Sequence, residues 1–214
     1  MEKLKTPDFA RKLAREVAPT SPAPSPAVFL AGWFGGAAFL AAFALAVLRL
    51  RPGFALAVTG LEFWLETSLW LSAGAMSALA VYRLSIPSMR TAPCEQGAIL
   101  LLSALLLSIA FRASPGGGSI AAELDWYRGR CGPIIIGLGA IYSVALFAWL
   151  KHAAPTRPTR SGAWAAVSAG LAGSFVLQFI CEHAEPAHLL LWHVTPVILL
   201  GTLGAWLGRK ALSW

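Results

Sequence analysis

The chain alternates long apolar stretches with short polar segments. Six stretches carry few or no charged residues, and they cover positions 27–48, 63–82, 96–111, 132–150, 162–180 and 188–207. A helix of about 20 apolar residues crosses a bilayer, because each residue adds about 1.5 Å toward a hydrocarbon thickness of about 30 Å. The pattern therefore predicts an all-α membrane protein with a bundle of six transmembrane helices.

The segment before the first apolar stretch predicts a short amphipathic helix in "TPDFARKLAREVAP". Phe9, Leu13 and Val17 recur every four residues and share one face. A helix of about 12 residues is marginal alone in water, so it needs a surface to lie on. That surface is either the membrane or the groove of a cytoplasmic partner, and the pattern fits both.

Three regions follow from this pattern. Residues 1–26 form a cytoplasmic head and a tether, "TSPAPSPA", whose prolines keep it extended. Residues 27–208 form the transmembrane bundle, and residues 209–214 form a cytoplasmic tail.

Charge predicts the orientation of the bundle. With the N-terminus in the cytoplasm, twelve Lys and Arg residues lie on the cytoplasmic side and five on the outer side. Cytoplasmic loops of membrane proteins are enriched in these residues, so both termini are expected in the cytoplasm. The net charge of +7 comes from short clusters between apolar stretches. We therefore expect contact with membrane lipid and no direct binding of nucleic acid.

Two cysteines are expected at the same outer end of the bundle. Cys131 opens the fourth stretch and Cys181 closes the fifth, so two crossings separate them. They can form a stapling disulfide, remain two free thiols, or act as a pair that an oxidant or soft metal modifies. Cys94 lies on the cytoplasmic side, where a reduced and inert thiol is expected.

The segment "FICEHAEPAHLLLWH" adds three histidines near Cys181. His188 and His193 are five residues apart, which is about 140° around a straight α-helix, so they are not expected to face one site. The predicted cluster is therefore Cys131, Cys181, His183 and His188, a donor set suited to zinc or another soft metal ion. The segment lacks CxxC and HxxxH spacing, so each histidine alone also fits an ordinary loop residue.

Glu62 and Glu66 lie one turn apart at the outer entry to the second stretch. A glutamate at the edge of the hydrocarbon needs a partner or water. We expect an ion pair with Arg49 or Arg51, with a role in holding a cation as the alternative.

Several segments resemble the negative-regulator-of-sigma-F family of membrane-bound anti-sigma factors. They are "FARKLAREVAPTSP", "LRLRPG" followed by "FWLETS", "HAAPTRPTRSGAWAAVSAGLAGSFVLQFICE", "LLLWH" and "GAWLGRKALSW". The resemblance implies a multi-pass protein of the bacterial inner membrane with both termini in the cytoplasm. It also implies that the N-terminal segment sequesters an extracytoplasmic-function sigma factor. The family's paired cysteines, linked to metal or oxidative stress, look like Cys131 and Cys181.

On this interpretation the head supplies the contacts with the sigma factor. The expected contact residues are Phe9, Arg11, Lys12, Leu13, Arg15 and Val17. No order of Ser, His and Asp and no phosphate-binding loop suggests an enzyme. The alternative functions are a small metal or solute transporter and a metal-binding membrane protein. A transporter would need ionisable residues near the middle of the membrane, and the centres of the stretches hold almost none.

Overall fold

The structure, a computed structural model, describes residues 23–86, 89–112 and 128–212 of the 214-residue chain. Within these ranges the chain forms helices and turns, with no strand. The described elements are α2 (Pro26–Leu48), α3 (Phe54–Ala57), α4 (Leu61–Leu84), α5 (Ala92–Phe111), the 3-10 helix η1 (Arg128–Arg130), α7 (Cys131–Ala153), α8 (Pro158–Leu177), α9 (Pro186–Leu189), the π-helix η2 (Leu190–Val194) and α10 (Thr195–Ala211). All six predicted apolar stretches are therefore confirmed as helical.

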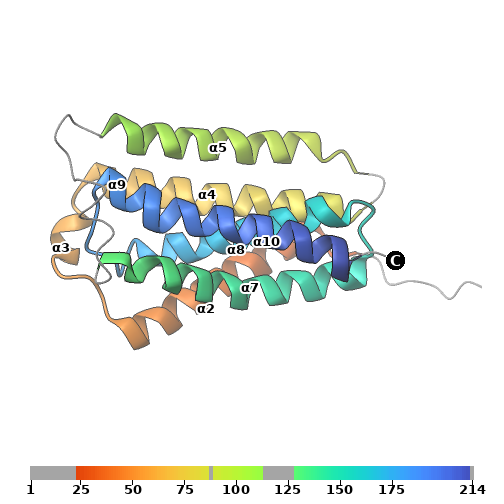
Figure 1. The fold of residues 1–214 in the computed structure, drawn as a ribbon, viewed down its shortest axis with the longest axis horizontal. Coiled ribbons are helices and arrows are strands. Elements are labelled where there is room, and N and C mark those ends of the chain that lie inside the picture. Colours follow the sequence, from red (N-terminus) through yellow and green to blue (C-terminus); the bar gives the residue numbers. More distant parts are fainter. Residues whose placement is uncertain (1–22, 87–88, 113–127, 213–214) are drawn as a thin grey trace, which may run out of the picture.

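The long helices lie side by side along the long axis of the molecule (Figure 1). Helix α8 is central and packs against α4, α7 and α10. Helix α5 lies outside against α4, and α2 packs on α4 and α8. The core follows this arrangement, because nearly every residue of α8 from Ala165 to Leu177 is buried.

Four helical segments are long and apolar enough to cross a membrane: α2, α5, α7 and the continuous helix Pro186–Ala211. Four of the six predicted spanning segments meet this measure, and α4 and α8 do not. Both helices carry Ser and Gly at buried positions, such as Ser168 in α8, and α4 also buries Thr67. These polar residues face neighbouring helices, and a helix surrounded by other helices needs less apolar character than one that forms the outer surface.

Helices α8 and α10 cross in direct backbone contact. A Cβ added to Gly162 would lie 2.3 Å from the carbonyl oxygen of Gly204, and one added to Gly208 would lie 2.4 Å from that of Pro158. A Cβ on Gly204 would lie 2.4 Å from the Cβ of Ala166. Small residues therefore allow the two helices to pack closely at this crossing.

A buried polar relay joins three helices. The indole nitrogen of Trp33 donates to the hydroxyl of Ser168 at 2.9 Å, and that hydroxyl donates to the carbonyl of Gly74 at 2.9 Å. The contacts link α2, α8 and α4 and satisfy both side chains inside the bundle.

The start of the described chain lies at the end of the bundle opposite Cys181. The hydroxyl of Tyr82, near the C-terminal end of α4, donates to the carbonyl of Pro24 at 2.7 Å. The C-terminus lies at this same end (Figure 1). The turns that follow α2 and α8 gather at the other end, where the candidate site lies.

Candidate functional site

Cys131 and Cys181 meet at the end of the bundle away from the termini. Cys131 is the first residue of α7, and Cys181 lies in the turn between α8 and α9. Their sulfur atoms are 3.1 Å apart, and both thiols are free and buried. The antiparallel packing of α7 against α8 thus brings together two residues 50 positions apart.

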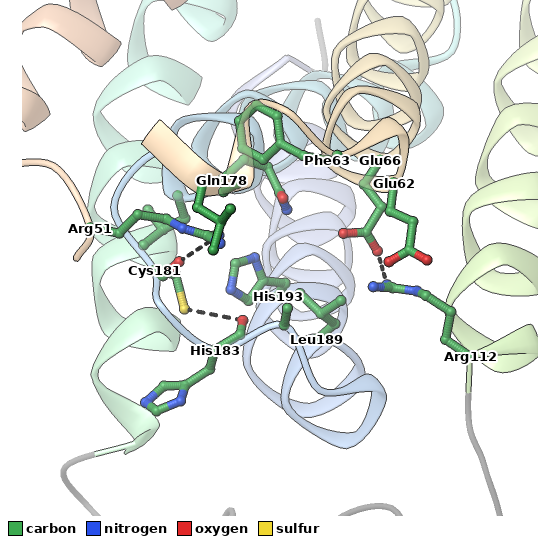
Figure 2. Close-up of a pocket in the computed structure, with 15 residues that line it drawn as sticks. Arg51, Glu62, Phe63, Glu66, Arg112, Gln178, Cys181, His183, Leu189 and His193 are labelled. Carbon is green, nitrogen blue, oxygen red and sulfur yellow. Dashed lines mark hydrogen bonds and ion pairs between the residues drawn. The ribbon is translucent and has the colours of Figure 1, made fainter. Parts of the chain in front are cut away.

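The turn that carries Cys181 is held by Arg51, which follows α2 (Figure 2). The backbone N–H of Arg51 donates to the carbonyl of Phe179 at 3.0 Å. Its guanidinium donates to the carbonyl of Cys181 at 3.2 Å. These two bonds fix the backbone on both sides of Ile180 and so fix the direction of the Cys181 side chain.

A π-helix sets the direction of two histidines. In η2 the N–H of Thr195 bonds to the carbonyl of Leu190, five residues earlier, and this spacing brings residues five apart onto nearly one face. Pro196 favours this geometry, because it has no N–H for the carbonyl of Trp192 and its ring would clash there in a regular α-helix. The rings of His188 and His193 lie 5.7 Å apart. The expectation that these two histidines face different sites is therefore wrong.

Four donor atoms converge as a result. One ligand atom each from Cys131, Cys181, His188 and His193 lies within 4.8 Å of all the others, and all four residues are buried. The Nε2 of His188 is 3.4 Å from the sulfur of Cys181. Two sulfur and two imidazole donors are the ligands that zinc and other soft ions prefer.

His183 lies beside this group and outside it. Its carbonyl accepts a hydrogen bond from the thiol of Cys181 at 3.6 Å, while its ring points away from His193 (Figure 2). The ring is 3.9 Å from the carboxylates of Glu182 and Glu185. The structure thus replaces His183 by His193 in the predicted cluster. Pro196, four residues after Trp192, was the feature of the sequence from which this difference could have been predicted.

His193 is the least satisfied member of the group. Its side chain is 1% exposed, and neither ring nitrogen has a hydrogen-bond partner. An unpaired buried polar group costs about 1–3 kcal/mol, so such groups are rare without a functional reason. The centroid of the Trp70 ring lies 6.1 Å from that of the His193 ring.

The two thiols are not equivalent. The thiol of Cys131 donates to the sulfur of Cys181, and this hydrogen bond lowers the pKa of Cys181 below its ordinary value. Burial opposes the shift, and the neighbouring imidazoles of His188 and His193 favour it. The hydrogen bond from Cys131 therefore favours the thiolate form of Cys181.

A cavity of about 210 Å³ reaches the group from the side of α4. Its lining includes Glu62, Glu66, Cys181 and His193. Glu66 forms an ion pair with Arg112, which follows α5. The expected pairing with Arg49 or Arg51 is therefore wrong for Glu66, and the guanidinium of Arg51 lies instead over the ring of Phe63 at 6.0 Å.

Trp192 packs the π-helix against the segment that positions Cys131. A Cβ on Gly129 would lie 2.8 Å from the Trp192 ring, and one on Gly132 would lie 2.9 Å from it. The glycines on both sides of Cys131 thus leave room for the indole. This contact couples the position of one thiol to the helix that carries both histidines.

Sequence reasoning missed a second buried polar cluster at the opposite end. The carboxylate of Glu95 accepts hydrogen bonds from Arg160 at 2.8 Å and from the indole of Trp164 at 3.0 Å. Cys94 is buried next to it. The cluster ties α5 to α8, and the presence of one acidic residue in an otherwise apolar helix was the only signal in the sequence.

The predicted contacts with a sigma factor lie outside the described residues. This applies to the whole head, including Phe9, Arg11, Lys12, Leu13, Arg15 and Val17. The structure therefore describes the bundle and the thiol site and leaves the head assignment as a prediction.

Comparison with known proteins identifies the family. The model of the family described as "Negative regulator of sigma F" matches residues 13–214, which is nearly the whole chain. The chain belongs to this family. The resemblance inferred from the sequence motifs is confirmed.

Two curated members of the family are similar along most of their length. The anti-sigma-F factor NrsF of Caulobacter vibrioides (strain NA1000 / CB15N) is 31% identical over 219 residues, covering 99% of this chain and 100% of that protein. The probable anti-sigma-F factor NrsF of Azospira oryzae (strain ATCC BAA-33 / DSM 13638 / PS) is 28% identical over 186 residues, covering 86% of each. Both names describe regulators. No solved structure matches the chain.

Proposed function

We propose that this chain is a membrane-bound anti-sigma factor. Its head, residues 1–26, holds an extracytoplasmic-function sigma factor at the bacterial inner membrane. Modification of Cys131 and Cys181 by a metal or an oxidant at the outer end of the bundle releases it. Membership of the negative-regulator-of-sigma-F family along residues 13–214 is the observation that carries the proposal.

The character of the bundle surface supports a membrane location. Outer helices expose large apolar side chains, among them Phe39 of α2, Leu107 of α5 and Val144 of α7, each at least 70% exposed. A water-soluble protein rarely exposes such contiguous apolar surface. We propose that all six long helices cross the membrane, with α4 and α8 shielded by the other four.

The orientation follows from the positions of charge and of the thiols. Both described ends of the chain lie away from Cys131 and Cys181. An arrangement with the termini in the cytoplasm and the thiols outside also agrees with the twelve-to-five distribution of Lys and Arg. The thiols would then face the compartment in which external metals and oxidants arrive first.

Deletion of the head tests the capture step. A chain lacking residues 2–20 should lose the ability to retain its sigma factor in a pull-down from solubilised membranes. The head substitutions Phe9→Ala, Leu13→Ala and Val17→Ala should weaken capture by removing the apolar face. Arg209→Ala with Lys210→Ala, which changes charge in the cytoplasmic tail, serves as the control. Full retention by the deleted chain would reject the head assignment.

Replacement of the thiols tests the sensing step. Cys131→Ser with Cys181→Ser should leave capture intact and reduce induction of a sigma-dependent reporter by cadmium or peroxide. Cys94→Ser is the matched control, because this thiol is also buried but lies at the other end of the bundle. Equal induction of the double variant and the parent would remove the pair from sensing.

A further inference from the structure

We propose that Cys131, Cys181, His188 and His193 bind one zinc-like ion in a buried tetrahedral site, and that the π-helix supplies the fourth ligand. This inference deepens the proposed sensing role by naming the ligand and its donors. Metal binding is measured on the purified chain in the absence of a sigma factor. A failure to bind metal can therefore be distinguished from a failure to capture the sigma factor.

The donor separations are close to those of a tetrahedral site. Zinc binds sulfur at about 2.3 Å and imidazole nitrogen at about 2.0–2.1 Å, which places two sulfurs about 3.8 Å apart and a sulfur about 3.6 Å from a nitrogen. The sulfurs of Cys131 and Cys181 are 3.1 Å apart, and the sulfur of Cys181 is 3.4 Å from Nε2 of His188. All four ligand atoms fall within 4.8 Å of one another. Shifts of less than an ångström therefore suffice for these two pairs.

His193 is the observation that points to a ligand. Its ring is almost fully buried, it faces the other three donors, and both nitrogens are unpaired. A metal ion would satisfy one of these nitrogens. A regular α-helix would turn the ring away from His188, so the π-helix has a direct consequence for ligand number.

The charges balance at such a site. Binding of a divalent ion displaces one proton from each thiol, and the two thiolates neutralise the two positive charges of the ion. The histidines bind as neutral imidazoles. The buried site therefore carries no net charge, which is the condition for stability in an apolar interior.

The cavity beside α4 gives the ion a route. It contains Glu62 and Glu66 on one side and reaches Cys181 and His193 on the other. Arg112, which also lines the cavity, pairs with Glu66, so Glu62 is the carboxylate of this lining that can receive a hydrated cation before the sulfur and nitrogen donors replace its water. Gln178 also lines this cavity, and its amide nitrogen is buried without a partner, which leaves an unpaired donor in the same lining as Cys181.

Zinc titration of the full-length, reduced and metal-free protein in detergent tests the proposal. A competing chromophoric chelator gives the affinity, and elemental analysis gives the stoichiometry, expected to be one ion per chain. His193→Ala should weaken zinc binding at least about tenfold. His152→Ala, at the far end of α7, is the matched control and should bind as the parent does. His183→Ala should change the affinity by less than about twofold, the scale on which context alters such measurements.

A cobalt(II) spectrum separates loss of a ligand from loss of the fold. The parent should show the intense visible bands of tetrahedral cobalt with thiolate ligands. His193→Cys should keep tight binding and strengthen the sulfur-to-cobalt absorption, because a third thiolate replaces the imidazole. The proposal is overturned if the parent binds no zinc stoichiometrically, if His193→Ala binds like His152→Ala, or if His183→Ala causes the larger loss.

Discussion

Arg51 donates a side-chain hydrogen bond to the carbonyl of Cys181 at 3.2 Å, although the two residues are 130 positions apart. The contact joins the end of α2 to the turn between α8 and α9. A charged donor to a carbonyl contributes more than a neutral one, about 1.5–3 kcal/mol when it is well formed. The position of the Cys181 thiol therefore depends on α2 as well as on the helices that flank it.

Arg51→Gln should open the turn and expose Cys181. We expect the thiol to react with a maleimide at least about fivefold faster, the factor that corresponds to a loss of about 1 kcal/mol of local stability. The measurement is the labelling rate of a Cys94→Ser, Cys131→Ser background, in which Cys181 is the one remaining thiol. Arg49→Gln, an exposed residue two positions earlier, is the control. Identical rates for both variants would show that Arg51 does not restrain the turn.

Pro196→Ala should weaken zinc binding without changing a ligand. An alanine provides the N–H that the Trp192 carbonyl lacks, so the π-helix can relax to an α-helix and turn His193 away from His188. The expected result is a tenfold or greater loss of affinity, about the effect of His193→Ala. Pro93→Ala in the first turn of α5, at the other end of the bundle, should not affect the site. Retained affinity in Pro196→Ala would mean that the proline does not maintain the π-helix.

Gly204→Ala should destabilise the bundle at the crossing of α8 and α10. The added methyl group would meet the Cβ of Ala166 and the carbonyl oxygen of Gly162, at 2.4 and 2.5 Å. Overpacking of this kind costs about 1–3 kcal/mol. Gly137→Ala in α7 is the matched control, because its Cβ meets nothing within 4 Å and alanine favours a helix. Thermal unfolding in detergent should therefore shift downward for the first variant and not for the second.

Bound zinc should protect the thiol pair from oxidation. Hydrogen peroxide converts two thiols to one disulfide and two molecules of water, and the bond requires the sulfurs to approach from 3.1 Å to about 2.05 Å. A metal ion needs the same sulfurs about 3.8 Å apart, so the two states exclude each other. Disulfide formation, followed by gel shift after thiol blocking, should slow on zinc addition to the parent and much less in His193→Ala. Equal protection in both proteins would contradict the role of His193.

Much of the fold was predictable because apolar length is a strong signal. All six stretches form helices, and the two-crossing separation of Cys131 and Cys181 anticipated their contact. Helices α4 and α8 are long enough to span a membrane but do not meet the apolar-composition criterion, since a helix inside a bundle packs through Ser, Gly and Ala rather than through large apolar residues. A hydropathy pattern cannot separate such a helix from a polar one without knowing its neighbours.

The site was only partly predictable because its geometry departs from a regular helix. The straight-helix assumption excluded His193, and the π-helix overturned that assumption. The partner of Glu66 was also misjudged, because Arg112 is distant in sequence and reaches it only through the packing of α5 on α4. Local periodicity predicts which face of a helix a residue occupies. Identifying a partner that is distant in sequence requires the tertiary structure.

The glycine crossing of α8 and α10 has a mechanical consequence. No side chain separates the two backbones at Gly162, Gly204 and Gly208, so no rotamer change can absorb movement there. The same two helices continue into the elements that hold Cys181 and His193 at the far end. A change in the distance between these donors that travels along α8 and α10 would therefore require the two helices to tilt about this crossing.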